Sequence, residues 1–294
     1  METLESLQRK LDGAKDIKSV VRTMKAMAAA NIQQYEMAVI SLADYYRTVT
    51  LGTVAYLKQA NLETTTKVEV APTNSEKTTY VIVFGSDQGL VAQFNDSLTA
   101  FVSDSLQNIS GKKEVWAVGE RVQLLLLDAG LTTTQFFHVP NSVHAITPLV
   151  SKILMNCLDR NRNGNEFYVF HNQPRETSGY LPVLQRLLPL DKKWKDTVEI
   201  MPWPTHKIPQ VAGGMKSTLE ALIREYLFVS LFKACAESLS SENASRLNAM
   251  QRAEKSIEEL LNNLGFEFNR LRQSSIDEEL FDVVSGFEML SKKK

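Results

Sequence analysis

Proline is missing from both ends of this 294-residue chain. All nine prolines lie between Pro72 and Pro209, so residues 1–71 and 210–294 contain none. Because proline breaks helix interiors, these ends can form very long helices. Cysteine is also scarce: Cys157 and Cys235 are too few for a disulfide framework, and we expect both to be buried thiols in a reducing compartment.

An excess of charge of either sign is lacking too, since 33 Lys and Arg residues stand against 34 Asp and Glu residues. This balance argues against nucleic-acid binding, which needs a basic face to neutralise phosphates. Apolar runs such as Leu124–Leu127 are far shorter than the roughly 20 residues of a membrane span. The first residues carry no basic and apolar export signal, and we expect a soluble, non-exported chain.

A 3.5-residue repeat runs through both proline-free ends. Alternate steps of three and four over residues 4–49 meet apolar side chains everywhere except at Lys18 and Lys25. The same walk over residues 219–271 is interrupted only at Lys233, Ser240, Asn243 and Glu254. A heptad pattern of this length predicts a left-handed supercoil with a partner helix. We predict that the terminal helices pair with each other, and a coiled coil between two copies of the chain is the alternative.

The last turns of the C-terminal helix are apolar on nearly all sides. Their apolar residues do not fit on one stripe: Leu260, Leu261, Leu264, Phe266, Phe268, Leu271, Ile276, Leu280, Phe281, Val283, Val284, Phe287, Met289 and Leu290. A helix that is apolar all round is normally buried. We therefore expect another protein to surround this tip, unless the tip folds back onto the chain's own core.

The middle of the chain alternates between strand and helix patterns. Short β-branched or aromatic runs predict strands at residues 80–84, 115–118, 135–139 and 167–170, with an edge strand near 183–188. Helical patterns separate them at residues 91–107, 121–128 and 145–158. Such alternation predicts βαβ units and a largely parallel sheet. The fold class is therefore α/β, with an α/β domain inserted between two long terminal helices.

This α/β domain carries no pattern typical of an active site. The turn Gly85–Leu90 follows a strand but lacks the glycine spacing of a dinucleotide site. The run Gly213–Thr218 lacks the first glycine of a phosphate loop, and we interpret it as a flexible entry to the last helix. No Ser or Cys is paired with a recognisable base. Metal-ligand spacing is absent around the four histidines, which we expect to be surface or structural residues: His138, His144, His171 and His206. We therefore predict no catalytic residue, cofactor or metal site.

Four blocks stand in a fixed order along the chain: Ala14–Val20 with Thr23, Met24 and Ala28–Ala30; Gly85–Leu90 with Phe94 and Asn95; Glu237–Met250; and Asn269–Gln273 with Ile276, Glu279, Asp282 and Gly286. Together they resemble the gamma subunit, the central rotor shaft, of F-type ATP synthases. The resemblance covers essentially the whole chain.

The resemblance implies an antiparallel left-handed coiled coil formed by residues 1–60 and 211–290. It also implies a Rossmann-like α/β domain over residues 72–209 that binds no nucleotide. In this family the shaft stands inside a ring of alpha and beta subunits, and its base joins the epsilon subunit and the ring of c subunits at the cytoplasmic face of the cell inner membrane. The implied function is that of a non-catalytic, peripheral subunit, which couples ion-driven rotation to ATP synthesis or hydrolysis.

Two other functions compete with this interpretation. One is a coiled-coil scaffold protein that homodimerises, and the other is a nucleotide-dependent enzyme built on the α/β domain. Sedimentation of the chain would distinguish the first, and calorimetry with nucleotides would distinguish the second.

The resemblance also places contacts with partner subunits on seven residues: Met24, Lys25, Arg246, Arg272, Gln273, Asp277 and Glu279. Of these, Arg272 and Gln273 fall where the family's shaft meets a loop of the beta subunit. Some positions depart from the family pattern, since Asp277 replaces the usual Thr and Phe287 follows Gly286 in place of Ala. These departures indicate a divergent branch of the family, such as a second ATPase in its organism.

Overall fold

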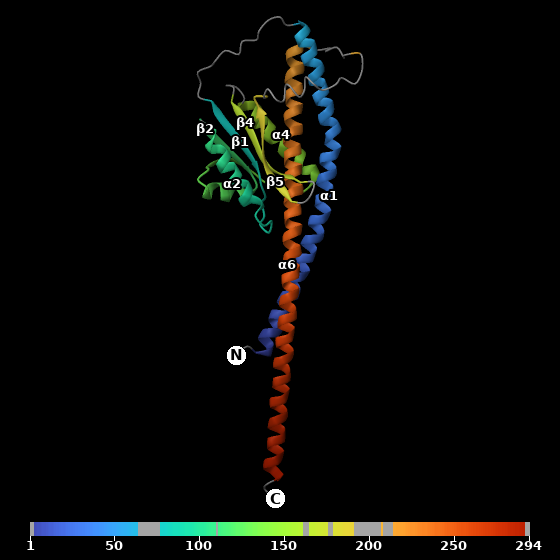
Figure 1. Cartoon of the computed structure of the whole chain (residues 1–294), viewed down its shortest axis with the longest axis vertical. Helices are drawn as coiled ribbons and strands as arrows, with labels where there is room; N and C mark the ends of the chain where they lie inside the picture. The colour runs from blue at the N-terminus through green and yellow to red at the C-terminus, as the bar shows by residue number, and fades with distance from the viewer. Residues whose placement is uncertain are drawn as a thin grey trace. The chain divides into compact units, whose positions relative to one another are not determined.

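The computed structural model describes residues 3–63, 77–109, 111–160, 165–175, 179–190, 207 and 214–291. Two long helices, α1 (Leu4–Glu63) and α6 (Met215–Ser291), flank an α/β region in the sequence, as predicted (Figure 1). The chain divides into two compact units. The smaller unit comprises residues 1–28 and 247–294, and the larger comprises residues 29–246.

The larger unit contains a five-stranded sheet with the order β3-β2-β1-β4-β5. Its strands are β1 (Thr78–Phe84), β2 (Lys112–Val118), β3 (Thr133–Phe137), β4 (Glu166–Pro174) and β5 (Tyr180–Leu188). The first four strands are parallel and β5 is antiparallel to β4, which confirms the largely parallel sheet and its edge strand. The order of the strands reverses between β1 and β4.

Three shorter helices connect these strands: α2 (Phe94–Gln107), α3 (Glu120–Asp128) and α4 (Val143–Arg160). The expected start of the first one, at residue 91, is wrong by three residues. Leu90 and Ala92 have φ angles of 62° and 49°, in the left-handed region that non-glycine residues rarely adopt. These two residues keep the chain out of the helical conformation until Phe94.

Helices cover both faces of the sheet. Ile82, Phe84 and the fully buried Trp116 contribute to a core that contains residues of α1, α4 and α6. Val81 and Val83, which point to the opposite face because side chains alternate along a strand, belong to the core formed with α2 and α3. The result is a layer of strands between two layers of helices.

Burial along α1 follows the predicted heptad seam. In the smaller unit the buried residues Leu7, Ala14, Val21 and Ala28 lie seven positions apart. In the larger unit Tyr35 and Val49 continue the same count. Burial at this interval is what a 3.5-residue repeat requires of one packed helix face.

Ion pairs in the smaller unit involve the charged residues that interrupt the apolar seams. Lys18 Nζ lies 2.8 Å from a carboxylate oxygen of Glu258, and Lys25 Nζ lies 2.5 Å from one of Glu254. Arg22 Nε is 2.8 Å from the other Glu254 oxygen. Rising residue numbers in α1 therefore pair with falling numbers in α6, and the charged interruptions of one seam meet acidic residues of the other helix.

The apolar residues near the C-terminal end of α6 are exposed. The exposed fraction is 53% for Ile276, 63% for Leu280 and 77% for Phe281, and Val283 and Val284 are more than half exposed. These side chains do not fold back onto a core of the chain, which leaves them free for another protein. No helix among the described residues has the length and hydropathy needed to cross a membrane.

Candidate functional site: a serine row between α6 and the sheet

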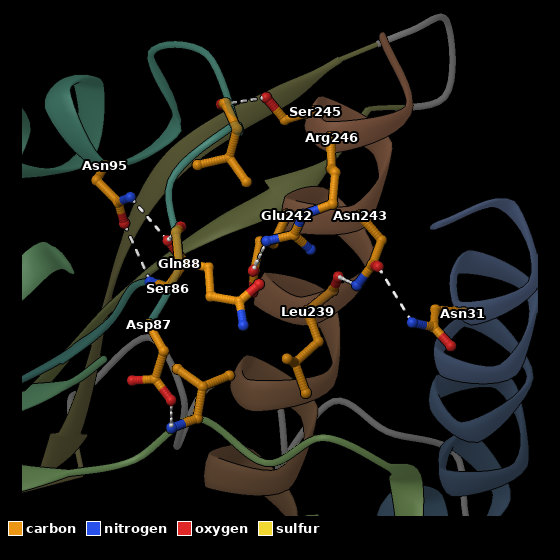
Figure 2. A network of polar contacts seen from close by, with 12 residues as sticks. Asn31, Ser86, Asp87, Gln88, Asn95, Leu239, Glu242, Asn243, Ser245 and Arg246 are labelled. Atoms are coloured by element: carbon orange, nitrogen blue, oxygen red, sulfur yellow. Dashed lines mark hydrogen bonds and ion pairs between the residues drawn. The ribbon is translucent and has the colours of Figure 1, made fainter. Parts of the chain in front are cut away.

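In the larger unit, three buried serines of α6 bind main-chain carbonyl oxygens of the α/β region. We call Ser238, Ser241 and Ser245 the serine row. Their hydroxyl groups donate as follows: Ser238 to Phe84 at 2.9 Å, Ser241 to Asn172 at 2.9 Å and Ser245 to Val91 at 2.6 Å. Because the steps are three and four residues, the hydroxyls share one face of the helix. Figure 2 shows Ser245 reaching across to the sheet side of the site.

The serine row meets the sheet where its strand order reverses. Phe84 is the last residue of β1, and Asn172 lies two residues beyond Phe170, where the pairing of β4 with β1 ends. In open α/β sheets, ligands bind in the crevice beside this reversal, at the carboxyl ends of the strands. Here Ser238 and Ser241 of α6 occupy that position. A nucleotide in the usual place would have to displace the helix.

The turn after β1 is held by its own polar groups. The Asn95 side chain accepts from the Ser86 amide at 3.0 Å and donates to the Ser86 hydroxyl at 2.8 Å, and that hydroxyl donates to the Gln88 carbonyl (Figure 2). Gly85 has no room for a side chain, because an added β-carbon would lie 2.3 Å from the β-carbon of Val122. The glycine in this turn thus permits close packing of α3, and the polar groups close the turn on itself.

One carboxylate links the turns that follow β1, β2 and β3. Asp87 accepts the amide of Glu120, the first residue of α3, at 2.9 Å and the amide of Val139 at 3.0 Å. An acidic group at a helix N-terminus is stabilised by the unpaired amides there. The imidazole of His138, which is largely exposed, lies 3.8 Å from the same carboxylate. Asp87 thereby fixes the edge of the sheet that α6 contacts.

A buried acid–base pair adds a side-chain link between β4 and α6. His171 Nε2 lies 2.8 Å from a carboxylate oxygen of Glu237, and Gln173 donates to the other oxygen at 3.3 Å. Burial alone would raise the pKa of the Glu237 carboxyl, but its hydrogen bond with His171, together with the charges of His171 and Lys233, lowers that pKa below its ordinary value. The geometry gives His171 a structural role, as expected from the sequence.

A second buried pair lies within α6 itself. Arg246 donates to Glu242 at 2.6 Å, one helical turn away, and both side chains are largely buried (Figure 2). Burial raises the pKa of the Glu242 carboxyl, an effect that Arg246 opposes and the charge of Asp87 reinforces. Next to this pair, Asn243 accepts a hydrogen bond of 3.4 Å from Asn31 of α1. The same turn of α6 therefore contacts both the sheet side and the other terminal helix.

The seven residues predicted as partner contacts do not form one cluster. Among the described residues, no hydrogen bond or ion pair joins any two of them. Met24 is half-buried, Lys25 is paired with Glu254, and Arg246 is turned toward Glu242. The other four lie exposed on α6: Arg272, Gln273, Asp277 and Glu279.

The serine row was missed by the sequence analysis, although it lies inside a block that carried the family resemblance. Its only signal is polar residues at positions i, i+3 and i+7 of a helix, and this pattern is also that of a solvated face. A solvated face and the serine row differ in what lies opposite the helix. For the serine row, this is main chain from segments far away in the sequence.

Comparison with known proteins places the chain in a family. A family model described as ATP synthase matches residues 3–290. Among curated proteins, the ATP synthase gamma chain of Wolbachia pipientis subsp. Culex pipiens is 24% identical over 99% of this chain and 100% of its own length. The gamma chain of Clostridium botulinum strain Langeland is 25% identical over 97% of each chain.

Solved structures share the fold. A chain of the Euglena gracilis mitochondrial ATP synthase, in a structure of its OSCP/F1/c-ring, has a TM-score of 0.63 at 15% identity and covers 99% of this chain and 96% of its own. A chain of the Tetrahymena thermophila mitochondrial ATP synthase central stalk and c-ring has a TM-score of 0.57 at 19% identity, covering 80% of this chain and 99% of its own. With a family model that spans nearly every residue and gamma chains of matching length, the chain belongs to the ATP synthase gamma chain family.

Proposed function

We propose that this chain is the central rotor shaft of an F-type ATP synthase. It is a non-catalytic subunit that couples rotation of an ion-driven membrane ring to ATP synthesis or hydrolysis at alpha and beta subunits. The observation that carries the proposal is the match to gamma chains from end to end, which includes both long helices as well as the sheet. A homodimerising scaffold would need only the helices.

For the shaft itself, we propose an antiparallel left-handed coiled coil of residues 1–60 with residues 211–290, and a separate Rossmann-like domain over residues 72–209. The seven-residue spacing of buried positions on α1 supports the supercoil. The opposed numbering of the ion pairs between α1 and α6 supports the antiparallel direction. Charged pairs in place of apolar ones at Lys18 and Lys25 would fix the register of the two helices.

At the C-terminal end, we propose that the exposed apolar residues of α6 stand inside the ring of alpha and beta subunits. Arg272, Gln273, Asp277 and Glu279, all exposed, are available for contacts with that ring. Met24, Lys25 and Arg246 complete the proposed set. An asymmetric shaft contacts each beta subunit differently, so rotation shifts every beta subunit in turn between its nucleotide-binding states.

For the base of the shaft, the proposed partners are the epsilon subunit and the ring of c subunits. The similar Tetrahymena chain comes from a central stalk and c-ring, and a similar Euglena chain comes from a rotor. We propose that the chain lies, as a peripheral subunit of this complex, at the cytoplasmic face of the inner membrane. Within the chain, the contacts of α6 with the sheet edge supply the connection between shaft and base.

Copurification tests the proposal. The full chain, tagged at its N-terminus and expressed in its own cells, is expected to bring down alpha, beta, epsilon and c subunits in a complex that hydrolyses ATP and pumps ions. Recovery of a stable homodimer without alpha and beta subunits would support the scaffold alternative and contradict the rotor. Sedimentation of the purified chain provides the matching measurement of its oligomeric state.

A further inference from the structure

We infer that the serine row of α6 is the torque-bearing connection between the shaft and the α/β domain, so that Ser238, Ser241 and Ser245 are positioning residues for rotary coupling. This inference rests on the proposed rotor function and specifies where in the chain the torque passes. It assigns a mechanical role to hydroxyl groups that lie far along α6 from the exposed tip.

The three acceptors of the serine row are distributed over the α/β domain. They belong to separate segments: Phe84 ends β1, Asn172 lies in β4 beyond its pairing with β1, and Val91 lies in the turn before α2. A rotation of α6 about its axis would move all three hydroxyls sideways from their carbonyls at once. Hydrogen bonds weaken steeply when their angle is lost, whereas the hydrophobic effect has no preferred direction. The serine row therefore resists the movement that torque would produce.

All three residues of the serine row are buried. The exposed fractions are 2% for Ser238, 1% for Ser241 and 6% for Ser245. Water cannot readily replace a bond that opens at such a position, so the serine hydroxyl would be left without an acceptor. A buried bond thus opposes displacement more strongly than the same bond on the surface.

Within the larger unit, α1 and α6 differ in the partners of their side-chain hydrogen bonds. Of the described residues there, α1 directs its side-chain hydrogen bonds to α6 or to itself, through Asn31, Tyr45 and its threonines. By contrast, α6 bonds to the strands and turns through the serine row and through Glu237. The polar contacts through which a torque of the two helices enters the α/β domain are therefore those of α6, whereas α1 contributes apolar packing to the core.

The test uses the assembled enzyme in inverted membrane vesicles, with ATP hydrolysis and ATP-driven ion pumping measured on the same preparation. The test variant combines Ser238→Ala, Ser241→Ala and Ser245→Ala. The control is Ser240→Ala, because Ser240 is buried to 2% exposure on the same helix turn and its hydroxyl makes no hydrogen bond among the described residues.

We expect the ratio of pumping to hydrolysis to fall several-fold in the triple variant and to stay at the wild-type value in the control. A merely structural role would lower the amount of assembled enzyme, and with it both activities in proportion, leaving the ratio unchanged. An unchanged ratio in the triple variant would overturn the inference. If the triple variant does not assemble, the single variant Ser241→Ala is measured in the same way. An unchanged ratio of pumping to hydrolysis in this variant would then overturn the inference.

The proposed function and this inference fail in different ways. If the wild-type complex lacked this chain, or hydrolysed ATP without pumping, the rotor function would be wrong. If the wild-type complex pumps and the triple variant pumps with equal efficiency, only the role of the serine row is wrong.

Discussion

Replacing Gly119 by alanine is expected to destabilise the larger unit at the edge of the sheet that faces α6. Gly119 precedes α3 and has φ 118° and ψ 131°, a conformation that residues with a side chain rarely adopt. A β-carbon there would lie 2.6 Å from the carbonyl oxygen of Ser86. That carbonyl is held in place by the amide of Arg121 at 2.9 Å, and Gly119 itself donates to Phe137 at 2.9 Å, so neither side can retreat freely.

The magnitude follows from two contributions. A side chain in this region of φ and ψ costs roughly 1 to 3 kcal/mol, and the contact with Ser86 adds a steric cost. We expect the free energy of unfolding to fall by about 2 to 4 kcal/mol, which is at the upper end for one substitution. The matched control is Gly130→Ala: Gly130 has φ 79°, but its added β-carbon would meet nothing within 4 Å, so only the conformational cost of about 1 to 2 kcal/mol remains.

Urea unfolding followed by tryptophan fluorescence measures both variants, because Trp116 is fully buried in the sheet. The reasoning requires Gly119→Ala to be clearly less stable than Gly130→Ala. Equal stabilities of the two variants, within an experimental error of about 0.5 kcal/mol, would refute the claim that the Ser86 carbonyl leaves no space.

Four further predictions concern the helices and the thiols. Hydrogen bonds from Lys25 and Arg22 lower the pKa of the Glu254 carboxyl to about 2, so its contribution to stability is complete above the ordinary pKa of 4.5 and is lost as the pH falls toward 2. The melting temperature of Glu254→Gln should therefore depend less on pH across this interval than that of the wild type. An unchanged pH dependence would contradict the pairing. Truncation after Gln273 should weaken coupling or assembly while leaving the sheet folded, as measured by pumping and tryptophan fluorescence; normal pumping would mean that the exposed tip needs no surrounding subunit. Asp277→Thr, at an exposed position, should change ATP turnover only modestly, and a total loss of turnover would assign it a larger role. Cys157 and Cys235, whose thiol pKa values are raised by burial, to about 12 for Cys157, should resist alkylation in the native chain, and rapid labelling would show that the core opens.

The terminal helices and the alternation of the middle could be predicted because their signals are local or periodic. The absence of proline and a sustained heptad repeat can be recognised within one stretch of sequence, and together they predicted α1 and α6. The repeat also identified Lys18, Lys25 and Glu254 as interruptions of the seam. The pairing of Lys18 with Glu258 and of Lys25 with Glu254 could not be predicted, because it joins residues more than 200 positions apart, and the repeat alone does not give the register between the two helices.

The contacts of α6 at the carboxyl ends of the strands could not be predicted from the sequence for a related reason. Polar residues at helical spacing look alike whether they face water or a row of carbonyls, so the serine row gave no distinct signal. The start of α2 was misplaced because Leu90 and Ala92 adopt positive φ angles that neither residue favours by itself. The hydrogen bonds between Ser86 and Asn95 join the two sides of this turn, and such contacts between turn residues are not visible in the local sequence pattern.

The proposed partner contacts differ in their exposure. Arg272 and Gln273 are exposed and free to meet a surrounding subunit. Arg246 lies largely buried against Glu242, an arrangement suited to holding the helix turn beside the serine row. The family pattern marks both kinds of residue in the same way, whereas burial separates them.

Observation of rotation tests the central claim most directly. A single thiol introduced at the exposed Asp128 of the α/β domain can carry a bead, because the native thiols are buried. With alpha and beta subunits immobilised and ATP supplied, the bead is predicted to turn continuously in one direction. A complex that hydrolyses ATP while the bead only fluctuates about a fixed angle would contradict the conclusion that this chain is the rotor.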